Sequence, residues 1–240
     1  MIKKTTTNNM SQHNSGRTKF QKKLDQKYNI EYFKDRNSND PRRIKAFKEE
    51  SNLIAKYIKK GYLLDVGCST GEFYDYVSWE GEKYGVEVSS FASDKAKERG
   101  IITSINIPDN KDYFDLVLLR GTIQHLDSPF YILQKIQSVL KSKGYLIFLA
   151  TPNSNSFYYK LWGELPALDS ELNFLIPSDI MLKNALQNMG FEFIEARYPY
   201  FKSPYSNFLT DHFKFVLKLF GYKTSFAFHK NMMDLVFKKK

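Results

Sequence analysis

The sequence has little of what a secreted or membrane-spanning protein needs. Its 240 residues contain one cysteine, Cys68, so no disulfide can form within the chain. The longest apolar runs, such as residues 116–119 and 145–150, are far shorter than the roughly 20 residues that cross a bilayer. The first residues include no apolar stretch typical of a secretory signal. These absences predict a cytoplasmic protein in a reducing compartment.

Three common ligand-site signatures are also missing. The sequence has no Gly-x-Gly-x-x-Gly, which would indicate a nicotinamide dinucleotide site, and no Gly-Lys-Ser/Thr, which would indicate a P-loop. The histidines are scattered at His13, His125, His212 and His229, without metal-ligand spacing. We therefore expect no metal.

The net positive charge is confined to the first quarter of the chain. The net charge is +10, and residues 1–60 account for all of it with 16 Lys and Arg against 6 Asp and Glu. Residues 61–240 are neutral. Because a nucleic-acid-binding domain needs positive charge on its globular face, this distribution argues against nucleic acid as the partner.

The composition predicts three segments. Residues 1–23 are rich in Thr, Asn, Ser, Gln and Lys and have no apolar period, which predicts a flexible basic tail. Residues 24–61 combine an aromatic cluster at 28–33 with a helix that Asp40 and Pro41 begin and Gly61 ends, so we expect a helical N-terminal lid. Residues 62–240 are expected to form a single domain.

From residue 62 on, short aliphatic runs alternate with amphipathic stretches, the pattern of a parallel sheet with crossover helices. The expected strands are 62–66, 83–88, 101–105, 114–119, 144–150, 191–197 and 232–238, the last two pairing antiparallel. Expected helices run from about Asp127 to Gly144, from Ser178 or Asp179 to Gly190, and over 207–220. The fold class is therefore α/β.

The most informative segment is the turn after the first expected strand. Gly67 and Gly71 lie four residues apart between a buried strand and a predicted helix, so the backbone could approach a ligand closely there. Glu87, twenty residues after Gly67, ends the next strand, where a carboxylate can accept hydrogen bonds from both hydroxyls of a ribose. Together these features predict a ligand of the adenosine type.

At these residues the chain resembles the class I S-adenosylmethionine-dependent methyltransferases, in the small-molecule branch of the type 11/23 kind. Asp65, Gly67 and Gly71 match the family pattern of an acidic residue followed by Gly-x-Gly-x-Gly, while Ser69 replaces the middle glycine. Further matching motifs follow in order at 84–88, 113–117, 124–126, 144–148 and 151–153. The resemblance implies a Rossmann-like sheet of seven strands, mostly parallel with the last one antiparallel, and helices on both faces.

The resemblance also implies a cofactor and its contacts. The cofactor would be S-adenosylmethionine, with S-adenosylhomocysteine as product. Its methionine portion would lie against Gly67, Ser69 and Gly71, its amino group near Asp65, its ribose on Glu87 and its adenine on Val88 and on Asn106 or Ile107. Arg120, directly after the fourth strand, would lie at the cofactor edge, although a solvated arginine is an equal alternative.

His125 is the candidate general base, because it follows the fourth strand and because a histidine can take a proton from a hydroxyl acceptor near neutral pH. The alternative is that His125 stabilises its loop. We interpret Cys68 as a packing residue and Asp127 as a helix cap.

Two segments are expected to surround the acceptor. Segment 151–177 supplies candidate substrate contacts in Asn153, Tyr158, Tyr159 and Trp162. Segment 198–230 is expected to cap the acceptor pocket or pack on the core; a membrane contact and a homodimer interface are the alternatives.

The sequence therefore predicts O-methylation of a small acceptor that could carry a phosphate, such as a sugar or a nucleotide-linked sugar in glycan or capsule biosynthesis. Three alternatives remain: a quinone or lipid methyltransferase at a membrane surface, an RNA methyltransferase that uses the basic arm, and a non-catalytic cofactor-binding partner protein.

Overall fold

A computed structural model describes residues 19–35, 40–166, 168, 173–201 and 203–240. Seven strands form one sheet in the order β3-β2-β1-β4-β5-β7-β6. The strands are β1 (Leu63–Val66), β2 (Lys83–Val86), β3 (Ile102–Ser104), β4 (Phe114–Arg120), β5 (Leu140–Pro152), β6 (Phe191–Arg197) and β7 (Met232–Lys239). Neighbours from β3 to β5 are parallel, while β7 is antiparallel to both β5 and β6. The predicted sheet, mostly parallel with an antiparallel last strand, is confirmed.

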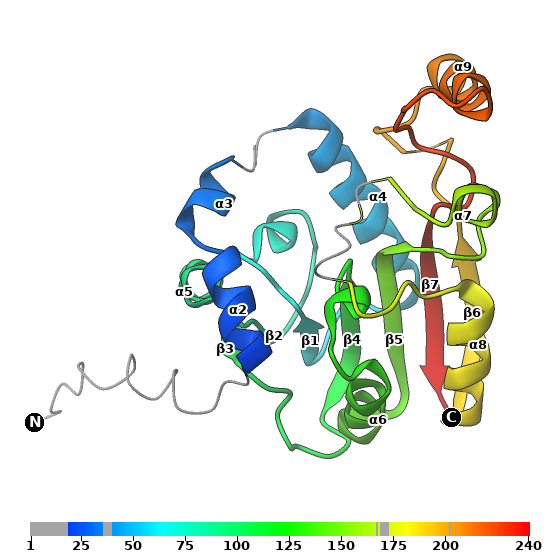
Figure 1. The fold of residues 1–240 in the computed structure, drawn as a ribbon. Coiled ribbons are helices and arrows are strands. Elements are labelled where there is room, and N and C mark those ends of the chain that lie inside the picture. The colour runs from blue at the N-terminus through cyan, green and yellow to red at the C-terminus, as the bar shows by residue number, and fades with distance from the viewer. Residues whose placement is uncertain (1–18, 36–39, 167, 169–172, 202) are drawn as a thin grey trace, which may run out of the picture.

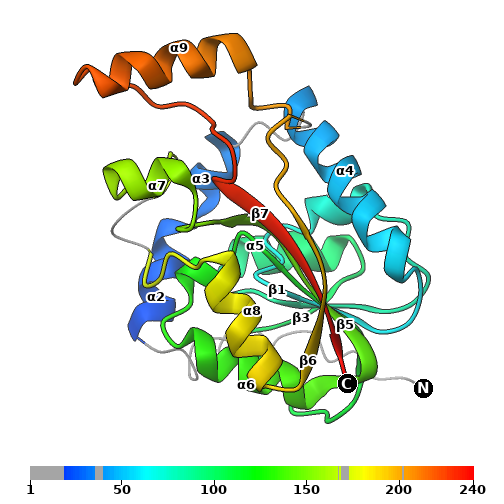
Figure 2. The same ribbon diagram turned by 90° about the vertical axis from the view of Figure 1, so that its right-hand side faces the viewer.

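Helices cover both faces of the sheet (Figures 1 and 2). On one face lie α4 (Pro41–Tyr57) and α5 (Ser90–Glu98), and on the other lie α6 (Pro129–Val139) and α8 (Asp179–Asn188). The remaining described helices are α2 (Lys19–Lys27), α3 (Ile30–Asp35), α7 (Phe157–Trp162) and α9 (Phe208–Leu219). Within the described residues, no helix combines the length and apolar character that crossing a membrane requires.

The alternation of side chains along the central strands builds two cores. In β4, Leu116 and Leu118 point into the core under α4, whereas Val117 and Leu119 point into the core under α6 and α8. All four are fully buried, as the unbroken aliphatic sequence of this strand predicts. The middle of the sheet is thus packed on both faces, and loops leave from its carboxyl edge.

Several elements differ from the sequence prediction. The helix expected to reach Gly144 ends at Val139, because the chain becomes extended at Leu140 and pairs there with Phe114. Its N-cap is Ser128 and not Asp127. The helix expected after the glycine turn is only the short 3-10 turn η1 (Glu72–Asp75).

The ends of the predicted segments also shift. Residues 1–18 of the expected tail lie outside the described residues, while residues 19–23 belong to α2. Segment 151–177, predicted to surround the acceptor, contains α7. In the 198–230 segment, α9 lies against α7 through Phe215, whose ring centroid is 5.4 Å from that of Trp162. In Figure 2, α9 lies at the margin of the fold, away from the sheet.

Candidate active site

The turn after β1 forms the floor of a pocket of about 240 Å³ at the carboxyl edge of the sheet. Gly67, Ser69 and Gly71 all have positive φ, at 84°, 54° and 73°. The Gly67 amide donates to the Val86 carbonyl oxygen at 2.8 Å, which holds the turn against β2. A Cβ on Gly67 would come within 2.5 Å of Thr122 Oγ1, so only glycine fits this position. Gly67 and Ser69 line the pocket, whereas Gly71 shapes the turn from behind.

Glu87 lies directly after β2 and faces this turn. Its Oε2 accepts a hydrogen bond from the Ser69 amide at 2.9 Å, and its Oε1 accepts one from the Ser89 amide at 2.7 Å. Burial raises the pKa of Glu87, and the backbone amides of Ser89 and Ser69 oppose that rise. Each carboxylate oxygen retains a lone pair that a ligand hydroxyl could use. Val88 lines the pocket beside it.

Asp65 is the most unusual charged group of the site. It lies in β1 with only 2% of its surface exposed, and its Oδ1 has no hydrogen-bond partner within the described part of the chain. Burial raises the pKa of Asp65 to about 7, against the opposing effects of the Tyr74 hydroxyl and the Arg120 charge. A buried acceptor without a partner costs free energy, and a donor group on a ligand could satisfy this one.

These observations fit S-adenosylmethionine. Asp65 offers an unpartnered acceptor for its amino group, Glu87 offers lone pairs for its ribose, and Gly67 leaves room that a side chain would fill. The adenine contacts fit less well. Asn106 is exposed and Ile107 belongs to the core under α6, and neither lines the pocket, because β3 ends two residues earlier at Ser104.

The N-terminal helices form the outer wall of this pocket. Leu24, Tyr28, Tyr32 and Phe33 all line it. The Ser89 hydroxyl donates to the Tyr28 carbonyl oxygen at 2.6 Å, and the Phe33 ring centroid lies 5.6 Å from that of Phe91. Segment 19–35 therefore rests on the start of α5 and covers the pocket as a lid would.

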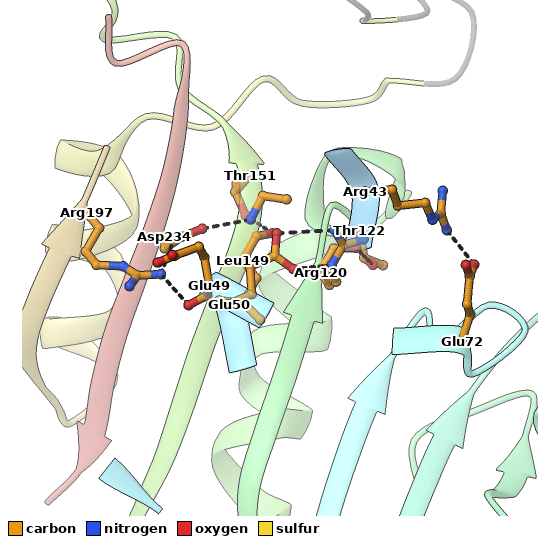
Figure 3. A network of polar contacts seen from close by, with 11 residues as sticks. Arg43, Glu49, Glu50, Glu72, Arg120, Thr122, Leu149, Thr151, Arg197 and Asp234 are labelled. Atoms are coloured by element: carbon orange, nitrogen blue, oxygen red, sulfur yellow. Dashed lines mark hydrogen bonds and ion pairs between the residues drawn. The ribbon is translucent and has the colours of Figure 1, made fainter. Parts of the chain in front are cut away.

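A second cavity of about 460 Å³ lies farther along the same edge, above the ends of β4, β5 and β6 and the start of β7. Arg120 lines both cavities. Its Nε lies 2.5 Å from Glu50 Oε2, and its guanidinium carbon lies 4.5 Å from the Phe47 ring centroid. Figure 3 shows this pair at the end of β4. Burial raises the pKa of Glu50, and the Arg120 charge opposes that effect.

A second ion pair lines the same cavity. Arg197 Nη2 lies 3.0 Å from Asp234 Oδ2 (Figure 3). The Ala150 amide donates to Asp234 Oδ1 at 2.9 Å. Burial raises the pKa of Asp234. Tyr198, Phe201 and Tyr205 add aromatic surface. The cavity thus combines two arginines, buried carboxylates and aromatic rings.

His125 lines the first cavity and not the second. It ends the short 3-10 turn η2 (Ile123–His125), and its Nε2 lies 3.3 Å from Nε2 of Gln124. Cys68 is buried, and a Cβ on Gly85 would lie 2.4 Å from its Sγ. This contact agrees with the packing role predicted for Cys68. No cluster of His, Cys, Asp and Glu suited to a metal occurs in the ranges that the structure describes.

The substrate contacts predicted in segment 151–177 are not brought to either cavity. Asn153 is fully buried, and its Oδ1 accepts from the amides of Asn155 and Asp179. Tyr158 is buried in a cluster with Leu165 and Phe226, against which Tyr159 and Trp162 pack. For the aromatic residues the cause of this correction is packing, since the Tyr158 ring contacts Phe226 and the Trp162 ring contacts Phe215 of α9.

Sequence reasoning missed the polar groups of the second cavity. Glu50, Arg197 and Asp234 come from α4, β6 and β7, far apart along the chain. The sequence held one signal for two of these residues, because Arg197 ends one strand and Asp234 lies near the start of its antiparallel neighbour. Such residues meet at the same edge of a sheet.

A family model described as a methyltransferase domain matches residues 36–196. The uncharacterized protein MJ1123 of Methanocaldococcus jannaschii is 27% identical over 163 residues, covering 65% of this chain and 77% of that protein.

Two solved structures show the same fold. An S-adenosylmethionine-dependent methyltransferase of Thermotoga maritima has 22% identity and a TM-score of 0.60, covering 83% of this chain and 91% of that one. A geranyl diphosphate C-methyltransferase of Streptomyces coelicolor, solved with Mg²⁺, geranyl diphosphate and S-adenosylhomocysteine, has 13% identity and a TM-score of 0.63, covering 93% and 99%.

Proposed function

Because the chain belongs to the class I S-adenosylmethionine-dependent methyltransferases, we propose that it methylates an oxygen of a small polyhydroxylated acceptor, such as a sugar or nucleotide-linked sugar. The observation that best supports this proposal is the shared wall of the two cavities. The first has the groups that suit the cofactor, and the second is roomier and lies next to it across Arg120.

The cofactor supplies a methyl group on a positively charged sulfur. In the proposal, Asp65 holds its amino group, the turn from Gly67 to Thr70 borders its methionine portion, and Glu87 holds its ribose. Because the donor is already activated, the protein's main task is to align the acceptor and to exclude water. The aromatic side chains of segment 19–35 serve the second purpose.

The acceptor belongs to the second cavity. Carboxylate oxygens of Glu50 and Asp234 can accept hydrogen bonds from sugar hydroxyls, while Tyr198 and Tyr205 offer aromatic faces to the sugar ring. Arg197 can bind a phosphate on the same substrate. Methylation of such an acceptor would serve the synthesis of a glycan or capsule.

His125 remains the proposed general base, acting from the cofactor side on an acceptor hydroxyl. Asp234 is the second candidate, because it is a buried carboxylate in the wall of the acceptor cavity. The two proposals place the base in different cavities. Variants of His125 and of Asp234, compared with each other, therefore distinguish the two proposals.

The experiment has two stages. Calorimetric titration of the full chain with S-adenosylmethionine and S-adenosylhomocysteine should show binding that Glu87→Ala abolishes. Release of S-adenosylhomocysteine is then measured with nucleotide sugars, free sugars, quinones and RNA as acceptors. Turnover only with quinones or RNA would overturn the sugar proposal, and binding without turnover on any acceptor would favour a non-catalytic role.

A further inference from the structure

Helix α9 presents an unusually apolar face to solvent. Leu209 and Phe220 are each 78% exposed, and Phe213 is 64% exposed. With Phe208, Val216 and Leu219, which are also exposed, these residues form the α9 apolar face. Their spacing of three and four residues places them along one side of the helix. An exposed patch of large apolar side chains on one element marks an interaction surface.

The opposite side of α9 is fixed to the protein by polar and aromatic contacts. Asp211 is buried and accepts hydrogen bonds from the Tyr200 hydroxyl at 3.1 Å and the Asn207 amide at 2.7 Å. Phe215 stacks on Phe228 with their ring centroids 4.8 Å apart. Lys218 Nζ, on the same side, lies 2.5 Å from Glu164 Oε1. The apolar face therefore cannot turn inward unless these contacts break.

The charge of the surrounding segment identifies the kind of partner. Residues 198–230 contain five lysines and one acidic residue, Asp211, which is buried. Lys214 and Lys223 are exposed. A second copy of the chain would bring the same exposed Lys214 and Lys223 against this face, and like charges repel. An anionic surface would be attracted to it.

We propose that the α9 apolar face binds the surface of an anionic lipid bilayer. Twelve residues at 1.5 Å each make a helix about 18 Å long, shorter than a bilayer core, so α9 would lie in the interface plane and not across it. Phenylalanine and leucine side chains on one face and lysines elsewhere are the features of such helices. This inference does not depend on the acceptor proposed above.

The face also continues to the acceptor cavity. Phe201 lines that cavity and is 74% exposed, and its ring stacks on that of Phe208 with centroids 6.2 Å apart. A bilayer bound by α9 would therefore lie beside the mouth of the cavity. An acceptor presented at the membrane surface would have a short path to it.

The test is co-sedimentation of the full chain with vesicles. The probes are phosphatidylcholine vesicles with and without phosphatidylglycerol, and the protein is compared with the double variant Leu209→Gln/Phe213→Gln. The matched control is Tyr131→Gln/Ile180→Gln, which removes two apolar residues of 57% and 56% exposure on α6 and α8. We expect the wild-type chain and the control to bind the anionic vesicles, and the α9 variant to bind about tenfold or more weakly.

Three results would overturn the proposal: no binding of the wild-type chain to anionic vesicles, equal binding by the α9 variant, or equal loss in the control. Light scattering tests the alternative occupant of this face, a second copy of the chain, by measuring whether the protein is a dimer. A dimer that the α9 substitutions dissociate, without vesicle binding, would assign this face to a second copy. Cofactor titration of each variant shows that the fold is intact.

Discussion

Arg120 and Glu50 form an ion pair, with Nε and Oε2 2.5 Å apart, between the pocket that Asp65 and Glu87 line and the larger cavity beside it. The two residues are 70 positions apart in the chain, and the contact ties α4 to the end of β4. Each partner is mostly buried, with side-chain exposures of 21% and 10%. The position of α4 over the site therefore depends on a charge contact as well as on apolar packing.

Removing one partner of this ion pair should lower the free energy of unfolding more than removing both partners. Arg120→Met leaves the Glu50 carboxylate buried without its cation, and we expect a loss of about 3 kcal/mol in the free energy of unfolding. The double variant Arg120→Met/Glu50→Leu should recover much of that loss. Urea unfolding at neutral pH measures both, and a double variant as unstable as the sum of its single variants would contradict the expectation.

Asp65 should make the cofactor-free protein less stable as the pH rises. Its pKa is raised to about 7 by burial, so in the folded protein it keeps a proton that the unfolded chain releases near pH 4. Stability is therefore lost between about pH 4 and pH 7 and is constant above that range. We expect Asp65→Asn to stabilise the protein more at about pH 8 than at about pH 5, as urea unfolding at both values would show. An equal effect at both pH values would contradict this account.

Ser69 is a non-glycine residue in left-handed backbone, with φ at 54°. An L-residue there costs about 1 kcal/mol relative to glycine, so Ser69→Gly should raise the free energy of unfolding by up to about that amount. Thermal unfolding measures the change. Gly67→Ala is the contrasting variant, because its Cβ would strike Thr122, and it should lower stability and cofactor affinity. A Ser69→Gly variant less stable than the wild type would show that the side chain makes a compensating contact.

The two candidate bases should differ in turnover. If His125 removes the acceptor proton, His125→Gln lowers kcat by about 100-fold or more while cofactor affinity is nearly unchanged. Asp234→Asn should then act mainly on KM, since Asp234 lines the proposed acceptor cavity. Steady-state kinetics with the best acceptor from the panel decides between them. A normal kcat for His125→Gln with a large loss in Asp234→Asn would assign the base to Asp234.

Local patterns predicted much of the fold. The sixth strand has the expected bounds, 191–197, because a β-branched and aromatic run lies between Gly190 and a proline-containing loop. The expected helix over 207–220 begins with Asn207 as its cap, whose side chain accepts from the Thr210 amide. The turn with Gly67 and the carboxylate of Glu87 lie together as the resemblance implies.

What the sequence could not show depends on contacts between distant segments. Packing against 226–228 sets the direction in which α7 turns its aromatic side chains. Tyr158, which the sequence predicted as a substrate contact, is therefore buried. The end of α6 at Val139 is set by strand pairing with Phe114 and not by a glycine. The second cavity, the proposed acceptor site, joins α4, β6 and β7, which no local motif connects.

Ser89 contacts both the candidate ribose carboxylate and the N-terminal wall. Its amide donates to Glu87, and its hydroxyl donates to the Tyr28 carbonyl oxygen. If a ligand binds more tightly when segment 19–35 rests on the pocket, thermodynamic linkage requires that the bound ligand shift the equilibrium of this segment toward the resting position by the same factor. Cofactor affinity and the protease resistance of the N-terminal helices thus depend on the same equilibrium, in which segment 19–35 either rests on the pocket or leaves it. A change in one of these two quantities predicts the change in the other.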